Sequence, residues 1–459
     1  MLKVKSARIL NGPIFSSILL YSLPLMISTL LQVLFNAADL AVVGNMADGN
    51  AIASVGATSP IVNLCVTSAV GLASGISIIL PRCLGAKDDE RTKRIVDTAL
   101  VLAVVLGAIL SVVAFFASPW LLDMTACPEE CYVGALTYLR IYMFSIPFAL
   151  VYNFGSAIIR ITGDSTRPMM YMIAAGATNM FLNIILCFTL ADKVAAVAIA
   201  TLASQVIGSV LVIIHLCRID GPCKIKLSKI RPHLGDMLSI IRFGLPGAFN
   251  TALFSLSNLQ IQSAINAYGP DAISGNTAAG YFEMVVASLS NSVADASIVF
   301  IGQNLGAENN DRVKKTIFSS IGICFTLGML GPLLYLLGKP LLGIFLPHEP
   351  IAVEFGIVRM RYILAIYFVG ALNSALSSVQ HAFGYPILPM LNSVVNVLLF
   401  RVIWMTFIYP FMPTVGVLVE DIANLYVCYT FSWSLCLIVN IIVCSIIYIR
   451  FRKGKYKRV

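Results

Sequence analysis

The chain has 459 residues, of which 58% are hydrophobic and 12% are charged, and its mean hydropathy is +0.88. Soluble domains carry roughly 45–50% apolar and about 25% charged residues, so this composition excludes a soluble globular protein, a disordered chain and a fibrous repeat. The net charge of +9 would indicate nucleic-acid binding in a soluble protein, but in a membrane protein it indicates orientation, and we expect no nucleic-acid partner.

Apolar runs separated by charged residues, glycine or proline predict twelve transmembrane helices. In chain order they occupy residues 14–44, 52–80, 93–117, 133–159, 168–190, 194–217, 237–267, 272–302, 314–337, 354–380, 387–410 and 422–449. At about 20 apolar residues per span, the hydrophobic content suffices for about this number. The predicted fold class is therefore an all-α integral membrane protein, embedded in the lipid bilayer.

The basic residues predict the orientation of these spans. Most of the 31 lysines and arginines fall in segments that lie inside if the N-terminus is cytoplasmic. Because cytoplasmic loops collect lysine and arginine, we expect both termini in the cytoplasm. The expected location is the plasma membrane, crossed many times.

An internal repeat divides the chain into two similar halves. A shift of 221 residues aligns Leu84-Gly85-Ala86 with Leu305-Gly306-Ala307, Gly107 with Gly328, Pro119 with Pro340, Arg140 with Arg361 and Gly163 with Gly384. Spans 2 to 5 match spans 8 to 11, so each half has six spans and the same topology. This pattern predicts two six-helix bundles related by a parallel pseudo-two-fold repeat, with an N-terminal lobe at 1–217, a cytoplasmic linker at 218–236 and a C-terminal lobe with a basic cytoplasmic tail at 237–459.

Two similar bundles joined by a linker favour a transporter that works by alternating access, although duplication can also merely enlarge a scaffold. The sequence contains no HExxH motif and no phosphate-binding Gly-x4-Gly-Lys-Ser/Thr loop. A membrane-embedded transferase or protease would need paired catalytic groups on facing helices, and no such motif is present. We therefore expect no enzyme and no catalytic residues, and an ion gradient as the energy source.

Four stretches in order resemble the multidrug and toxin extrusion (MATE) transporters over nearly the whole chain. They are Leu23-Pro24 through Asn36, Asp39 and Gly44; Leu84-Gly85-Ala86 with the basic run that follows; Arg160 with Gly163-Asp164 and Pro168; and Gly302-Gln303-Asn304-Leu305-Gly306-Ala307. The resemblance implies twelve helices in two lobes. It also implies export of small organic compounds, often cations, in exchange for inward H+ or Na+, with no other cofactor.

The resemblance further implies an ion site in the N-terminal lobe, built from an Asp on the first helix with polar residues on the fifth and sixth. These positions fall on Asp39, Asn179, Asn183 and Thr201, and Na+ at Asp39 would be the sole metal. Asn183 stands where some members have a second Asp. Another branch has an acidic residue in the seventh helix, where this chain has Ser257-Asn258.

The residues themselves support a polar face on the first helix. Gln32, Asn36 and Asp39 recur at i, i+4 and i+7 and therefore share one face. Ionisable groups inside membrane spans are costly, so each is a candidate for function. We expect Gln32, Asn36 and Asp39 to belong to the coupling site; the alternative is that Asp39 bonds the neighbouring amides only to fix helix packing.

The C-terminal half holds a second set of candidates. Glu283 is a candidate for binding a cationic substrate or a coupling ion, or else for a side chain that snorkels to the interface or forms a salt bridge between the lobes. Asp295, with Asn291 one turn before it, either receives entering cations or has a structural role. Arg401 is the arginine placed well inside a span, where it either neutralises an acid or bonds carbonyls at a helix end.

The function predicted from the sequence is a secondary active multidrug exporter that works as a monomer. The alternative is a flippase for lipid-linked saccharides or peptidoglycan precursor, because similar two-bundle folds serve that role. A flippase would need a cleft rich in arginine and lysine for a pyrophosphate, and this chain has few basic residues within its predicted spans.

Overall fold

The computed structural model of the chain describes residues 8–46, 49–125, 127–413, 416 and 418–454, without the side chains of 33, 36–46, 49–53, 255–256, 259 and 418. Its regular elements are all helices, with no strand among the described residues. Ten described helices are long and apolar enough to cross a membrane, and two bent helix pairs bring the number to as many as twelve. The predicted all-α membrane fold is confirmed.

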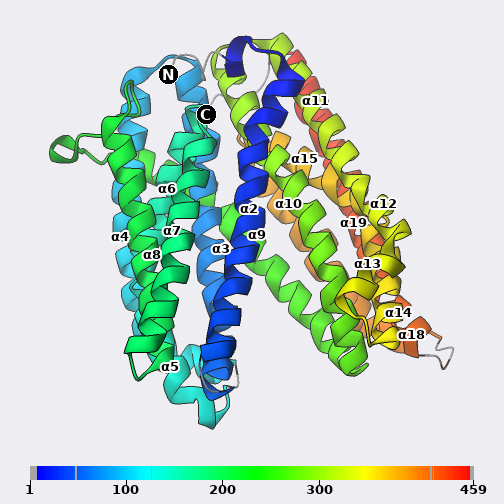
Figure 1. The fold of residues 1–459 in the computed structure, drawn as a ribbon. Helices are drawn as coiled ribbons and strands as arrows, with labels where there is room; N and C mark the ends of the chain where they lie inside the picture. The colour runs from blue at the N-terminus through cyan, green and yellow to red at the C-terminus, as the bar shows by residue number, and fades with distance from the viewer. Residues whose placement is uncertain (1–7, 47–48, 126, 414–415, 417, 455–459) are drawn as a thin grey trace. The chain divides into compact units, whose positions relative to one another are not determined.

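The chain up to Asn266 forms long, nearly uninterrupted helices (Figure 1). They are α2 (Ile14–Met46), α3 (Gly49–Gly85), α4 (Asp89–Met124), α5 (Glu129–Met143), α6 (Ile146–Ile161), α7 (Thr166–Thr189), α8 (Lys193–Arg218), the 3-10 turn η1 (Leu227–Lys229) and α9 (Leu234–Asn266). Each of the six predicted spans from 14 to 217 lies on one of these helices or, for 133–159, on the α5 and α6 pair.

The chain after Asn266 is more broken. It contains α10 (Pro270–Gly306), α11 (Asn310–Gly328), α12 (Leu330–Leu336), α13 (Gly338–Phe345), α14 (Pro350–Arg359), α15 (Tyr367–Ala382), α16 (Ile387–Ser393), α17 (Phe400–Ile403), α18 (Leu418–Asp421) and α19 (Ala423–Arg452), with π-helical turns η2 (Met360–Leu364), η3 (Val394–Leu399) and η4 (Trp404–Ile408) and the 3-10 turn η5 (Tyr409–Phe411). Helix α13 was not expected, because a single run of eight residues is too short to give a periodic signal.

The internal repeat is visible in the backbone. The pair α5 and α6 bends by 44°, and the matching pair of 350–364 and α15 bends by 41°. Next to these bends, Gly107 and its match Gly328 lie so close to α6 and α15 that an added Cβ would sit 2.5 Å from Pro147 Cα and 2.7 Å from Phe368 Cα. Duplication has therefore preserved the same close helix contact in both halves.

The turn after the second span of each half is also preserved. Lys87 and its match Glu308 both adopt a positive φ, 57° and 56°. In the next position, the side chains of Asp88 and Asn309 cap the following helices by accepting a hydrogen bond from the backbone N–H three residues on. Different side chains thus make the same cap at equivalent places.

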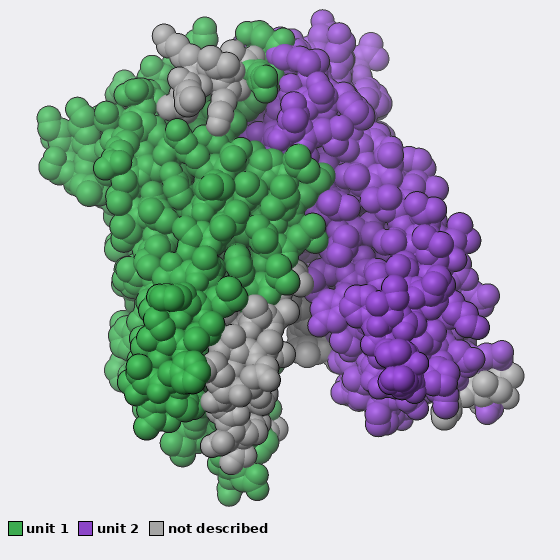
Figure 2. All heavy atoms as spheres, viewed as in Figure 1, with its two compact units in different colours: residues 1–11, 23–248 green, residues 12–22, 249–459 purple. Residues whose placement is uncertain are grey.

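The chain packs into two compact units, shown in Figure 2. The first contains residues 1–11 and 23–248, and the second contains residues 12–22 and 249–459. These boundaries differ from the lobes predicted at 1–217 and 237–459, because the first parts of α2 and α9 pack with helices of the other half of the sequence. Within the second unit, for example, the ring of Tyr21 packs edge-on against Phe300 at 5.6 Å between ring centroids.

Glycines hold the start of α9 against α3 inside the first unit. A Cβ on Gly75 would lie 2.3 Å from the carbonyl oxygen of Ile240, and one on Gly244 would lie 2.4 Å from that of Leu72. One turn before Gly75, a Cβ on Gly71 would lie 2.4 Å from Ala248 Cα. The two backbones therefore approach at distances that no other residue type allows.

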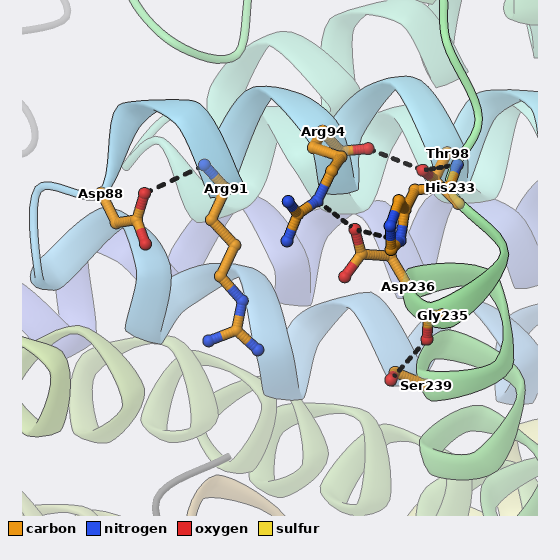
Figure 3. Close-up of polar contacts among 8 residues, drawn as sticks. All are labelled: Asp88, Arg91, Arg94, Thr98, His233, Gly235, Asp236 and Ser239. Atoms are coloured by element: carbon orange, nitrogen blue, oxygen red, sulfur yellow. Dashed lines mark hydrogen bonds and ion pairs between the residues drawn. The ribbon is translucent and has the colours of Figure 1, made fainter.

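An ion pair fixes the same end of α9 to α4 (Figure 3). Arg94 Nε donates to Asp236 Oδ2 at 2.6 Å, His233 Nδ1 lies 3.5 Å from the same oxygen, and the His233 backbone N–H donates to Thr98 Oγ1 at 3.0 Å. The linker therefore ends in a segment that is bonded to the first unit.

Within the linker, burial raises the pKa of the Cys223 thiol to about 12, which keeps it neutral.

Candidate functional site

A cavity of about 280 Å³ lies among α2, α3, α5, α6, α7 and α8 of the first unit. Its polar and aromatic lining consists of Gln32, Phe35, Asn63, Tyr138, Tyr142, Tyr152, Asn153, Asn179, Thr201, Ser204 and Gln205. No charged side chain is among the described residues that line it. Such a lining offers oxygen ligands and hydrogen-bond partners to an ion or a polar ligand.

A chain of hydrogen bonds joins α7 to α8 at this cavity. Asn183 Nδ2 donates to Asn179 Oδ1 at 3.2 Å, Asn179 Nδ2 donates to Thr201 Oγ1 at 3.4 Å, and Thr201 Oγ1 donates to the backbone carbonyl of Val197 at 3.0 Å. Asn179 and Asn183 are both buried and lie one turn apart, so they share a face of α7. The structure therefore brings together three of the predicted coupling residues, whose role stays a prediction.

The predicted residues of the first helix are only partly described. Gln32 lines the cavity from α2, on the same side as Phe35. Asn36 and Asp39 belong to the helix α2, but their side chains lie outside the described residues. Of the predicted polar face, the structure therefore places Gln32.

The second unit has a smaller cavity of about 150 Å³, lined by Phe254, Asn258, Ile261, Gln262, Ile265, Glu283, Arg359 and Tyr429. Glu283 Oε2 accepts a hydrogen bond from Arg359 Nη2 at 2.5 Å. Arg359 Nη1 donates to Asn276 Oδ1, which also accepts from the Tyr426 hydroxyl at 3.0 Å. The predicted site residue Glu283 is thus held in an ion pair that belongs to a hydrogen-bonded cluster with Asn276 and Tyr426.

This ion pair is well shielded, since the side chains of Arg359 and Glu283 are 15% and 21% exposed. Removing one partner from a buried pair leaves the other charge uncompensated, at a cost of about 3–5 kcal/mol. Arg359 was not predicted as a site residue. It lies 76 positions from Glu283, and no local pattern connects two residues on different helices at that separation.

Arg401 lies behind the same cavity and is completely buried. Its Nη1 donates to Asn258 Oδ1 at 3.0 Å, and its guanidinium stacks over the ring of Tyr429 at 4.0 Å and that of Phe254 at 5.5 Å. It pairs with no carboxylate in the described part of the chain, and its hydrogen-bond partner is a side-chain amide. Both alternatives expected from the sequence are therefore replaced by a third arrangement.

The contacts of Arg401 offset only part of the free-energy cost of burying its charge. Insertion scales place an arginine at the centre of a membrane helix at about 2.5–3.5 kcal/mol, and cation–π contacts return about 0.5–2 kcal/mol. Two guanidinium nitrogens of Arg401, Nε and Nη2, are buried without a hydrogen-bond partner among the described residues. A buried charge that is only partly compensated is a candidate for function.

The remaining predicted residues, Asn291 and Asp295, lie on α10 away from the lining of this cavity. Both are exposed. Asn291 Oδ1 accepts a hydrogen bond from Ser374 Oγ of α15 at 2.8 Å. The structure therefore does not join these two residues to Glu283.

The two cavities occupy equivalent positions of the repeat. Val62, Tyr138 and Gly208 line the first cavity, and the residues that match them, Glu283, Arg359 and Tyr429, line the second. The shift that aligns glycines and prolines therefore also aligns the cavities. Their chemistry differs, because the apolar Val62 is matched by the acid Glu283 and the phenol Tyr138 by the base Arg359. The third match places the phenol Tyr429 where the first half has Gly208.

Comparisons with known proteins agree with one another. The family model MatE matches residues 24–189 and 246–406. The chain is 27% identical over 348 residues to the probable multidrug resistance protein YoeA of Bacillus subtilis, covering 73% of this chain and 74% of the relative. It is 23% identical to the multidrug export protein MepA of Staphylococcus aureus, covering 82% and 83%.

Solved structures of similar fold include a MATE transporter in a bent conformation, with a TM-score of 0.87, 21% identity and coverage of 98% of this chain and 99% of the other. A multidrug resistance MATE family transporter in an outward-facing conformation has a TM-score of 0.85 at 22% identity and covers 96% and 97%. At these identities the likeness establishes the fold alone.

Proposed function

This chain belongs to the MatE family, the multidrug and toxin extrusion transporters, and from that premise we propose that it exports organic cations in exchange for inward H+ or Na+. Transport proceeds by alternating access, without covalent chemistry. The curated relatives are named as multidrug resistance or export proteins, which supports a broad range of organic substrates. The protein works as a monomer in the plasma membrane with both termini cytoplasmic.

The observation that carries the proposal is the polar cavity of the first unit. The buried amides of Asn179 and Asn183 and the half-buried hydroxyl of Thr201 are joined in one hydrogen-bonded chain on α7 and α8, and Asn179 and Thr201 line the cavity. Buried polar groups inside membrane helices are expensive and mark ion or substrate pathways. Neutral oxygens such as these bind a cation more strongly beside a negative charge, which Asp39 supplies in this proposal.

Coupling follows from competition for one negative charge. A carboxylate at Asp39 that has bound H+ or Na+ is neutral and releases a cationic substrate, and a carboxylate that has lost the ion binds the next one. The ion gradient then drives substrate outward because the ion is taken up on one side and released on the other. Asn179, Asn183 and Thr201 serve as the polar partners of this group.

The test is gradient-driven efflux of ethidium or norfloxacin in proteoliposomes, with proton and sodium gradients imposed separately. The variant is Asp39→Asn, and the matched control is Asp123→Asn, an exposed acid at the end of α4. We expect Asp39→Asn to insert normally and lose gradient-driven export, and Asp123→Asn to transport like the wild type. Full export by Asp39→Asn would refute the coupling role.

The same assay separates the exporter from its rival. Wild-type protein that exports none of the cations under either gradient would contradict the proposal and favour a flippase of lipid-linked saccharides. The gradient that drives transport identifies the coupling ion.

A further inference from the structure

We propose that the cavity of the second unit, lined by Asn258, Glu283, Arg359 and Tyr429, binds a carboxylate group on its Arg401 side. This site goes beyond the proposed function, which assigns cation binding and no anion site. It would take small organic acids, or the acidic group of a larger zwitterionic compound.

The charges around the cavity do not balance. Glu283 and Arg359 neutralise each other through the ion pair at 2.5 Å. Arg401, with 0% of its surface exposed, pairs with no carboxylate among the described residues. One positive charge is therefore left over at the cavity wall, and an anionic ligand group would balance it.

The directions of the hydrogen-bond donors at the cavity also favour an anion. Arg401 Nη1 donates to Asn258 Oδ1, so the oxygen of that amide faces the guanidinium and its Nδ2 faces away. Asn258 lines the cavity, and no described residue accepts from its Nδ2. The hydroxyl of Tyr429, also in the lining, has no hydrogen-bond partner in the described part of the chain either. Two donors are therefore available beside the buried charge.

The shape of a carboxylate suits these donors. A carboxylate has two oxygens, which suit two separate donors and a nearby guanidinium. The cavity of about 150 Å³ has room for such a group with a small organic body. Arg401 donates to the oxygen of the Asn258 amide and so orients its Nδ2 donor. The buried arginine therefore acts as a positioning residue, and its positive charge attracts the carboxylate electrostatically.

The experiment measures binding of radiolabelled benzoate to the purified full-length protein by equilibrium dialysis, with benzamide and chloride as competitors. Benzamide has the shape of benzoate without its charge, and chloride has the charge without the two carboxylate oxygens. We expect saturable binding of benzoate. Benzamide and chloride, at concentrations at which unlabelled benzoate displaces the label, should not displace it. Absence of saturable binding, or equal displacement by either competitor, would overturn the proposal.

Three variants test the residues. Arg401→Gln should abolish saturable binding, and Tyr429→Phe, which keeps the ring under Arg401 and removes only the hydroxyl, should weaken it about tenfold. The control is Arg361→Gln, an exposed arginine two positions after Arg359 that bonds Tyr335. Unchanged affinity in both Arg401→Gln and Tyr429→Phe would overturn the assignment. Tyr429→Phe keeps the test valid if Arg401→Gln does not fold.

This assay needs no gradient and no transport, so it is independent of the proposed exchange mechanism. Asp39→Asn should bind benzoate like the wild type. If the wild-type protein exports cations but does not bind benzoate, the anion site is refuted and the proposed exporter function stands.

Discussion

At the scale of single residues, the first cavity depends on amides that satisfy one another. Asn183 is completely buried and uses Asn179 Oδ1 as an acceptor, and Asn179 in turn reaches Thr201 on α8. A buried polar group that loses its partner costs about 1–3 kcal/mol. The same side chains therefore serve the stability of the helix pair and are available to an ion.

We predict that Asn179→Leu lowers the stability of the purified protein by about 1–3 kcal/mol, because the Asn183 amide loses this acceptor. Gradient-driven efflux should fall as well if the residue belongs to the coupling site. The measurements are thermal unfolding in detergent and efflux in proteoliposomes. The control is Thr189→Val at the exposed end of α7, whose hydroxyl bonds only carbonyls of its own helix; it should change neither. Unchanged efflux in a folded Asn179→Leu protein would remove Asn179 from the site.

At the scale of elements, the backbone contact between α3 and α9 depends on glycine. Gly71, Gly75 and Gly244 occupy positions at which a Cβ would lie within 2.5 Å of backbone atoms of the other helix. Real Cβ atoms are not found at such distances, so any substitution forces the helices apart. The Arg94 and Asp236 ion pair also holds the start of α9 to the first unit.

We expect Gly75→Ala to destabilise the protein by about 1–3 kcal/mol, the usual cost of overpacking. The matched control is Gly322→Ala on α11, where an added Cβ meets nothing within 4 Å. That change should be neutral or stabilise by up to about 1 kcal/mol, because alanine is the better helix former. The measurement is thermal unfolding of both variants. Equal unfolding temperatures for Gly75→Ala and Gly322→Ala would show that the contact between α3 and α9 can relax.

At the scale of the whole molecule, duplication has preserved the scaffold and changed the chemistry. The bends at 44° and 41°, the glycine contacts of Gly107 and Gly328 and the turns at Lys87 and Glu308 recur at equivalent positions. The cavities recur too, but with neutral lining residues in the first unit and an ion pair in the second. Two sites with different ligands are the expected result.

The orientation of the molecule in the membrane is open to a direct test. We predict that an epitope tag at the C-terminus is reached by antibody only after the cells are permeabilised, whereas a tag inserted after Glu349 is reached on intact cells. The reason is the excess of lysine and arginine in the segments expected inside. Tags inserted after Lys229 in the linker should behave like the C-terminal tag. The opposite pattern would reverse the predicted topology and with it the direction of transport.

The sequence by itself determined the features that depend on local pattern and on duplication. The predicted spans follow from apolar runs, and the described residues contain ten membrane-length helices, or as many as twelve with the two bent pairs. The repeat follows from matched glycines and prolines, and the shared face of Asn179 and Asn183 follows from helical spacing. The resemblance to a transporter family rests on the same order of motifs. None of this requires knowledge of which helices are neighbours.

Tertiary structure decided which of these residues meet. Glu283 is paired with Arg359, and Arg401 reaches Asn258 and Tyr429, across separations of 76 positions or across three different helices. A sequence carries no periodic signal for such contacts, since they depend on how bent helices pack. The 58% of hydrophobic residues thus predicted a membrane protein, whereas the balance among its few buried charges became visible only once the helices were packed.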